Sequence, residues 1–245
     1  MKETQAIIER VRRVNELYQQ LDLSVDASLT QMKAGQSLLA RVGDGWEPYL
    51  RDQWWPAAIS GGIVTVELPV GVKYEPGQVV DLIGIVGQPY RFRRTLRNVL
   101  LLAYDTDLAP FLLMLPALLA NRVSVTLVLL GSAATYSTGH LAAEIEVITG
   151  DGELNWANRV TTIGWADQVF VITPQDDGLA HFKRIWDLFS QLRAEVPASY
   201  LFAVVRMPLP CGVGACSACM VRTKGANQLI CTNGPAFDMT QMLFA

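Results

Sequence analysis

Cys211-Gly-Val-Gly-Ala-Cys216-Ser-Ala-Cys219 is the segment that most narrows the interpretation of this chain. It contains three of the four cysteines, and the fourth, Cys231, follows after eleven further residues. The spacing Cys-x4-Cys-x2-Cys with a more distant fourth cysteine is that of plant-type [2Fe–2S] sites, in which four thiolates converge on one cluster. The spacing therefore predicts that Cys211, Cys216, Cys219 and Cys231 ligate a [2Fe–2S] cluster.

The residues between these cysteines suit a tight loop around a metal site. Gly212 and Gly214 can adopt positive φ, which lets backbone N–H groups turn inward toward sulfur. The side chains between the cysteines are too small to crowd a metal, since these residues are Ala215, Ser217 and Ala218. We predict that the two glycines shape the loop and that its hydrogen bonds to sulfur tune the reduction potential.

Two other uses of the cysteines stay open from the sequence. A structural zinc site also takes four thiolates, although such sites more often combine two Cys-x2-Cys pairs, and this chain has one such pair. The thiols could also be incidental. Disulfides would join only a short C-terminal loop in a chain that is long enough to have its own core, so we do not expect them.

Composition and charge exclude several classes of protein. The chain has 245 residues, of which 51% are hydrophobic and 18% charged, with a net charge of −3. The length predicts one or two domains, and the high apolar content argues against disorder. The slight acidity argues against nucleic-acid binding. The two histidines, His140 and His181, are far apart in the sequence, so we assign no His-based triad and no catalytic residue.

No segment of the sequence predicts export or a membrane span. The first 20 residues carry charges throughout and lack the apolar core of a signal peptide. The most hydrophobic region, residues 99–130, never reaches an uninterrupted apolar run of about 18 residues. Polar residues interrupt it at Asp105, Asp107, Asn121 and Arg122. We expect a cytoplasmic location.

The hydrophobic pattern divides the rest of the chain into three parts. Within residues 1–30, apolar residues recur at steps of three and four from Glu3 to Leu21, which predicts an N-terminal amphipathic helix that either caps its own domain or docks on another chain. Residues 31–97 contain short runs between glycines and prolines, which predict a small antiparallel β-barrel or sandwich. Its predicted strands are 36–42, 62–68 and 79–86.

Residues 98–203 alternate apolar strands with helices, which predicts an α/β domain with a parallel sheet buried on both faces. The predicted strands are 98–103, 123–130, 145–149 and 169–173, and the predicted helices are 108–120 and 180–195. Residues 204–245 then form the cluster-binding domain. The predicted fold class is therefore α+β multidomain.

The cysteine motif, together with Cys231-Thr-Asn-Gly-Pro-Ala-Phe-Asp238, resembles the electron-transfer subunit of class 1B dihydroorotate dehydrogenase, in the ferredoxin-reductase superfamily. The resemblance extends weakly upstream to about Lys33, through Glu75-Pro76-Gly77 and Thr149-Gly150-Asp151-Gly152. It implies a ferredoxin-reductase-like fold with a flavin-binding barrel, a nucleotide-binding α/β domain and a C-terminal cluster loop. It also implies FAD, NADH and a catalytic partner subunit.

The positions that hold flavin in the family differ here. The family's Arg-Pro-x-Ser motif is replaced by Trp55-Pro56-Ala57-Ala58, so a guanidinium and a hydroxyl are lost, and no Gly-x-Gly-Thr segment lies between Val66 and Tyr74. Each lost charge-assisted hydrogen bond is worth about 1.5–3 kcal/mol. Trp54, Trp55 and Pro56 mark the flavin-site-like position. We hypothesise that the two tryptophans fill the volume of the flavin ring, and the alternative is an ordinary aromatic core pair.

The positions that hold the nucleotide differ as well. A glycine-rich turn that approaches pyrophosphate is replaced by Ala103-Tyr104-Asp105-Thr106-Asp107, where two carboxylates would repel a phosphate. The family's Cys-Gly-Pro is replaced by Ile172-Thr173-Pro174. The sequence therefore keeps the turns of both domains while the contacts to FAD, and still more those to NAD(P), are weakened.

These features predict an iron–sulfur electron-transfer subunit that relays single electrons to or from a partner oxidoreductase or flavoprotein in a hetero-oligomer, rather than a self-sufficient enzyme. One alternative is a complete FAD- and [2Fe–2S]-dependent NAD(P)H oxidoreductase subunit. Another is a structural subunit stabilised by zinc or by a cluster. A run of basic residues precedes the α/β domain and comprises Arg91, Arg93, Arg94 and Arg97. This run is either a solvated turn or a docking patch for an acidic partner.

Overall fold

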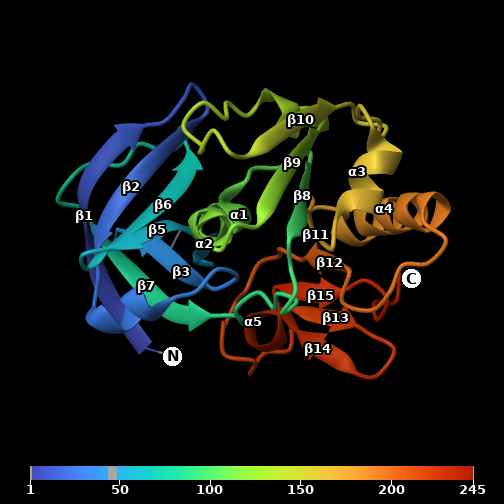
Figure 1. Ribbon diagram of the computed structural model, residues 1–245. Helices are drawn as coiled ribbons and strands as arrows, with labels where there is room; N and C mark the ends of the chain where they lie inside the picture. Colours follow the sequence, from blue (N-terminus) through green and yellow to red (C-terminus); the bar gives the residue numbers. More distant parts are fainter. Residues whose placement is uncertain (1, 44–48, 245) are drawn as a thin grey trace.

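The computed structural model describes residues 2–43 and 49–244, which form two sheets and a small C-terminal unit (Figure 1). The first sheet is antiparallel and curled, and its strand order is β4-β3-β7-β1-β2-β6-β5. Its strands are β1 (Lys2–Arg13), β2 (Tyr18–Ser24), β3 (Ser37–Val42), β4 (Asp52–Trp54), β5 (Pro56–Ser60), β6 (Ile63–Pro69) and β7 (Val79–Val86), with the short 3-10 helix η1 (Ala27–Gln31). The predicted antiparallel fold is confirmed as a curled half-barrel, and the sheet also includes β1 and β2, which precede the predicted bounds 31–97.

The predicted N-terminal amphipathic helix is wrong, because residues 2–24 form two strands of this sheet. Strand β1 pairs with β7 on one side and with β2 on the other. Its alternation of buried Ala6 and Ile8 is interrupted by a shift of register between Ile8 and Arg10. A bulge of this kind inserts a residue and changes the phase of the period-2 pattern, so the apolar spacing imitates a helical one.

The second sheet has the order β10-β9-β8-β11-β12-β15, and its strands are parallel except for β15 (Ala236–Asp238). Its elements are β8 (Asn98–Tyr104), α1 (Ala109–Leu112), α2 (Met114–Ala120), β9 (Ser124–Leu130), η2 (Gly131–Thr135), β10 (Glu146–Gly150), α3 (Arg159–Trp165), β11 (Gln168–Ile172), α4 (Gly178–Leu192) and β12 (Leu201–Val204). The predicted α/β fold is confirmed, and its sheet also takes in β15 from beyond the predicted bounds 98–203. The predicted helix 108–120 is divided in two at Leu113, since Pro116 has no N–H to donate to the preceding turn.

The two faces of this sheet are covered by different helices. Leu100 and Leu102 of β8 lie in a core with residues of α3 and α4, whereas Leu101 lies in a core with residues of α1 and α2. This alternation follows from the period of a strand. Helices α1 and α2 lie between the two sheets, and α3 and α4 lie on the far side (Figure 1).

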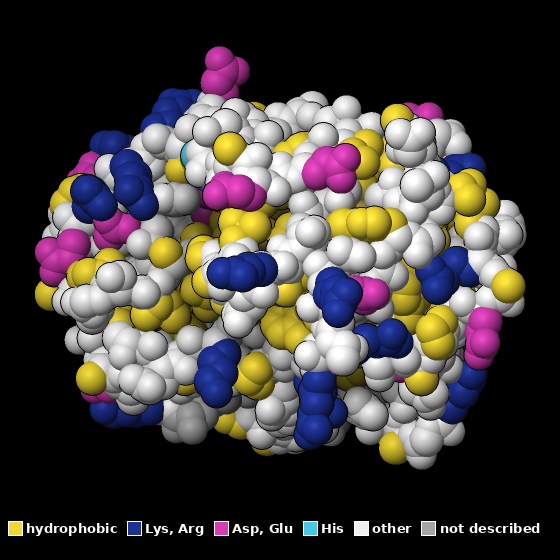
Figure 2. Space-filling view, viewed as in Figure 1, with side chains coloured by type: hydrophobic (Ala, Val, Ile, Leu, Met, Phe, Trp, Pro, Cys, Tyr) yellow, Lys and Arg dark blue, Asp and Glu magenta, His cyan; other side chains and the backbone are white. Residues whose placement is uncertain are grey.

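The C-terminal unit is joined to both sheets. It consists of β13 (Met220–Arg222), β14 (Asn227–Leu229), α5 (Ile230–Asn233) and β15 (Ala236–Asp238), and β15 pairs with β12. The N–H of Gly87, just past β7, donates to the carbonyl of Cys231 at 3.1 Å, and the N–H of Gln88 donates to Gly234 at 2.6 Å. Figure 2 shows several Lys and Arg side chains over the lower middle of the molecule, where Figure 1 places α5, β13 and β14.

Candidate metal centre

The loop between β12 and β13 carries Cys211, Cys216 and Cys219, and the short helix α5 carries Cys231. Cys219 and Cys231 are buried, and their Sγ atoms lie 3.3 Å apart. Cys211 is half-buried and interacts with the thiol of Cys216, which is exposed. The thiols thus form two pairs, one inside the fold and one nearer its surface.

The glycines give the loop the predicted shape. Gly212 and Gly214 have φ of 65° and 79°, in the left-handed region, so their predicted positive φ is confirmed. A Cβ atom at Gly214 would lie 2.9 Å from Cγ2 of Thr232 in α5. Glycine therefore lets the loop approach the helix that carries Cys231.

Backbone N–H groups stabilise charge on the first thiol. Hydrogen bonds from the backbone of Cys216 and Val213 lower the pKa of Cys211 to about 6. Burial, together with the adjacent Cys219, raises the pKa of Cys231 to about 12. Metal ligation deprotonates a thiol outright, because the cation outweighs both burial and the repulsion between neighbouring sulfurs.

Thiolate-only donors select zinc or an iron–sulfur cluster. Within residues 2–43 and 49–244, no three Cys, His, Asp or Glu side chains are arranged to hold a single metal ion. The arrangement in two pairs, with inward N–H groups at the loop, fits a two-iron cluster that takes two thiolates per iron. Cys211 and Cys216 would hold one iron, and Cys219 and Cys231 the other.

The flavin-site-like residues lie mostly within the first sheet. Trp54, at the end of β4, is buried in the core of that sheet, with its ring edge-on to Tyr74 at 5.8 Å between ring centroids. Trp55 and Pro56 are also buried. The nearby cation Arg51 forms an ion pair with Glu3 at 2.5 Å and is therefore engaged elsewhere. The hypothesis that the tryptophans fill the flavin volume stays a prediction.

The side of β5 that faces the second sheet is covered by the protein itself. Helix α1 packs on β5, and Ala57 of that strand contacts the core that contains Phe111 of α1. The same core takes in Tyr18 of β2 and Ala34. The apolar core is thus continuous between the two sheets at the strand where the resemblance places the flavin.

Buried polar side chains also join the two sheets. Glu67 of β6 accepts a short hydrogen bond from the hydroxyl of Tyr136, after η2, and another from Gln20 at 2.9 Å. The ring of Tyr136 lies 5.0 Å from that of Tyr18, and its hydroxyl is 3.1 Å from Nε2 of His140. Burial, together with the charge of Glu67, raises the pKa of Tyr136, so its hydroxyl stays protonated as the donor.

An ion pair spans the point where the second sheet changes strand order. Nucleotides bind in sheets of this kind at the carboxyl ends of the strands, in the crevice between β8 and β11. Here Arg206, which follows β12, donates to Oδ2 of Asp107 at 2.9 Å and also contacts Thr106 and the Thr173 carbonyl. Oδ1 of Asp107 accepts from the N–H of Ala109 at 3.0 Å. A carboxylate of the chain thus accepts from Arg206 and from the N–H of Ala109, two donors that could otherwise bind a phosphate.

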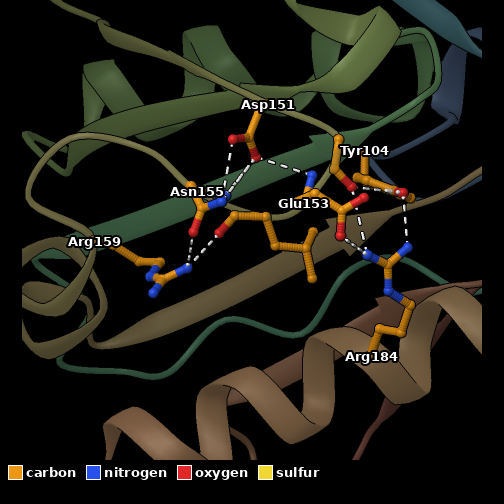
Figure 3. A network of polar contacts seen from close by, with 8 residues as sticks. Tyr104, Asp151, Glu153, Asn155, Arg159 and Arg184 are labelled. Atoms are coloured by element: carbon orange, nitrogen blue, oxygen red, sulfur yellow. Dashed lines mark hydrogen bonds and ion pairs between the residues drawn. The ribbon is translucent and has the colours of Figure 1, made fainter.

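A second network covers the same edge further out (Figure 3). The hydroxyl of Tyr104 donates to the carbonyl of Gly152 at 3.1 Å and accepts from Arg184 of α4 at 3.1 Å. Arg184 also pairs with Glu153 at 3.2 Å, and Asp151 accepts from the N–H of Glu153 at 2.9 Å. With Tyr104 bridging the loop after β10, the residues at this edge do not fit a dinucleotide at the family's position.

Comparisons with known proteins agree with this centre and this fold. Residues 208–243, which include all four cysteines, match the family model described as the iron–sulfur cluster binding domain of dihydroorotate dehydrogenase B. The electron transfer subunit of dihydroorotate dehydrogenase B (NAD(+)) from Clostridium perfringens is 23% identical over 180 residues, or 70% of each chain. The resemblance seen in the cysteine motif is confirmed.

Solved structures share the fold at low sequence identity. The NADH-dependent reduced ferredoxin-NADP oxidoreductase gives a TM-score of 0.74 with 16% identity, covering 98% of this chain and 90% of that one. The ferredoxin reductase of carbazole 1,9a-dioxygenase gives 0.60 with 14% identity, covering 83% and 69%. The predicted ferredoxin-reductase-like fold is therefore confirmed.

Within the described part of the chain, no helix has the length and apolar content to cross a membrane.

Proposed function

We propose that this chain, which resembles the electron-transfer subunit of dihydroorotate dehydrogenase B, relays single electrons through one [2Fe–2S] cluster to or from a partner oxidoreductase. The observation that carries the proposal is the gathering of the four thiols into two pairs, with Cys219 and Cys231 at 3.3 Å. In this assignment the thiolates of Cys211, Cys216, Cys219 and Cys231 are the iron ligands.

The loop residues have distinct roles in this proposal. When bound, the cluster supplies reversible one-electron chemistry. The N–H groups of Val213 and Cys216 stabilise negative charge on the sulfur of Cys211, and such hydrogen bonds tune the reduction potential. The buried pair anchors the site in the fold, whereas the exposed Cys216 places the other end where a partner can approach.

The rest of the chain positions this loop. Pairing of β15 with β12, and the backbone bonds from Gly87 and Gln88, hold the C-terminal unit against both sheets. We infer three units, with residues 2–30 joined to 31–97, followed by 98–203 and 204–245. The substrate chemistry then takes place on the partner, a flavoprotein or dehydrogenase subunit in a hetero-oligomer.

The contacts at the two nucleotide positions favour this function over a complete NAD(P)H oxidoreductase. Relatives carry NAD(+) or NADH in their names, but here the Asp107–Arg206 pair and the Tyr104 network occupy the edge at which a dinucleotide binds. We also infer a cytoplasmic location, because cluster assembly needs reduced thiols and the cytosol keeps thiols reduced.

Anaerobic reconstitution with iron and sulfide tests the proposal. We expect visible iron–sulfur bands and, after dithionite reduction, the paramagnetic resonance signal of one reduced [2Fe–2S] centre. Cys219→Ser and Cys231→Ser should lose that signal. The control Ala218→Ser introduces the same side chain into the loop without removing a thiol, and it should keep the signal. A colourless protein that binds one zinc per chain with all four thiols would instead establish the structural alternative.

A further inference from the structure

A cavity of about 680 Å³ lies where the two sheets and the C-terminal unit meet. One wall is the segment that leads out of β7, with Arg91 and Phe92. The opposite wall belongs to the C-terminal unit and includes Gln228, Thr232 and Asn233. Neither the cluster ligation nor the nucleotide positions use these side chains.

The charge of the cavity is positive, although the whole chain is acidic with a net charge of −3. The exposed Arg91 has no ion-pair partner among the residues that the structure describes. The guanidinium of Arg93 donates to the neutral carbonyls of Ala198 and Ser199, at 2.9 and 3.0 Å. The acid in the lining, Asp238, is already bonded through both oxygens within its own turn and to a backbone N–H. With two arginines and one carboxylate in the lining, the cavity keeps a positive net charge, and no ion pair between Asp238 and Arg91 or Arg93 occurs in the described part of the chain.

The cavity also offers an apolar surface beside that charge. The side chain of Phe92 is 40% exposed, and its ring packs edge-on against Phe170 of β11 at 5.6 Å between centroids. Phe237 of β15 lies buried beneath the lining. An aromatic surface next to an unpaired arginine is the composition found at the centre of protein interfaces.

Thr232 connects the cavity to the metal centre. This residue lines the cavity and directly follows the proposed ligand Cys231. Its carbonyl accepts a hydrogen bond from Nε2 of Gln88 at 2.9 Å. Its methyl group packs against Gly214 of the cysteine loop so closely that a Cβ atom there would clash with it. Anything bound in the cavity thus lies against the wall that carries the cysteine loop.

We infer that this cavity is the docking site for an acidic segment of the redox partner, whose carboxylates meet Arg91 and whose apolar side chain covers Phe92. The inference rests on the proposed electron-transfer function. The basic charge continues outside the cavity through the exposed Arg94 and Arg97, an area that a small anion in the cavity would not touch. This extension favours a protein surface over a small molecule.

Electron transfer to carriers of opposite charge tests the inference. The reconstituted protein is reduced with dithionite, freed of excess reductant, and mixed by stopped flow with the acidic copper protein plastocyanin or the basic haem protein cytochrome c. One electron leaves the reduced protein and converts Cu(II) to Cu(I), or haem Fe(III) to Fe(II), with no bond formed and no proton moved.

We expect plastocyanin to react faster at low salt than at high salt, because opposite charges steer the encounter. Arg91→Glu should lower its rate constant at low salt by about 3–10-fold and raise that of cytochrome c. The control Arg122→Glu, at an exposed arginine before β9, makes the same change of net charge away from the cavity and should leave both rates near the starting values.

Three outcomes would overturn the inference. The first is that Arg91→Glu and Arg122→Glu change the electron-transfer rate constants equally. The second is a rate constant for plastocyanin that does not depend on salt. The third is that Arg91→Glu leaves the rate constants of both carriers unchanged but abolishes the binding of flavin mononucleotide in calorimetry. The last result would make the cavity a small-anion site. Failure of the proposed function appears earlier and separately, as a protein that forms no reducible cluster.

Discussion

The ion pair between Asp107 and Arg206 should contribute measurably to stability, because it joins the ends of β8 and β12 at the edge of the second sheet. The side chain of Arg206 is 8% exposed and that of Asp107 is 28% exposed. Removing one partner of a buried pair leaves the other charge uncompensated and costs about 3–5 kcal/mol. Asp107 is partly solvated, so we expect Asp107→Ala to lower the free energy of unfolding by about 3 kcal/mol.

Urea unfolding of the reconstituted protein, followed by circular dichroism, measures this loss. With an m-value of about 3 kcal/mol/M, the midpoint should fall by about 1 M. The double variant Asp107→Ala/Arg206→Met removes the uncompensated guanidinium as well. It should therefore lose about 2 kcal/mol less than the sum of the two single changes.

A control tests whether the effect depends on burial. Asp187→Ala breaks the exposed pair with Lys183 on α4, and such pairs contribute about 0.3–0.5 kcal/mol. If Asp107→Ala proved as mild as Asp187→Ala, or if the single changes simply added, the pair between Asp107 and Arg206 would not hold the edge of the sheet together.

Three further outcomes follow from other parts of the structure. Because the nucleotide positions are occupied by the chain's own side chains, FAD or NADH at 0.1 mM should leave the thermal midpoint of the holoprotein unchanged. A ligand that binds at 100 times its Kd adds about 2.7 kcal/mol of stability, so a stabilisation of several degrees would show that a nucleotide site is open. Gly214→Ala should reduce the fraction of chains that bind iron, because residue 214 has a positive φ and the added Cβ would clash with Thr232. The control Gly225→Ala adds a Cβ with no atom within 4 Å and should not change iron binding. Equal iron contents in the two variants would refute the close approach of the loop to α5. Burial raises the pKa of Asp22, but hydrogen bonds from Thr65 and Arg10 outweigh it, so the pKa of the folded state lies below that of the unfolded state. The Asp22 carboxylate therefore contributes its full share to the free energy of unfolding above the unfolded pKa, and that share is lost as pH falls through the folded pKa. Asp22→Asn should cost about 1–2 kcal/mol at pH 7 and progressively less below pH 4 in urea unfolding, and a cost independent of pH would contradict this.

Much of the second sheet was predictable because its strands are buried on both faces. Residues 98–104 and 124–130 are almost wholly apolar, and this continuous pattern has no competing helical interpretation at that length. The cysteine loop was predictable for another reason, since ligand spacing and glycine conformation are local properties.

The first two strands were not predictable from periodicity. The bulge after Ile8 makes their pattern ambiguous, and only pairing of β1 with both β2 and β7 decides it. Short strands such as β4, with three residues, carry too little pattern to detect.

The residues that cover the nucleotide positions were likewise missed. Arg206 lies just past a buried strand, which places it at a carboxyl edge, but its partner Asp107 is 99 positions away in the chain. The contact of Glu67 with Tyr136 spans 69 positions. Such pairs depend on how the two sheets are placed, and no local signal in the sequence encodes that placement.

Coulometric titration of anaerobically purified protein, with iron and acid-labile sulfide measured on the same sample, tests the central claim most directly. Four thiolates holding a two-iron cluster predict two iron atoms, two sulfide ions and the uptake of one electron per chain. A preparation that takes up no electron, and that contains neither iron nor sulfide while its four thiols remain free or bind zinc, would contradict the account.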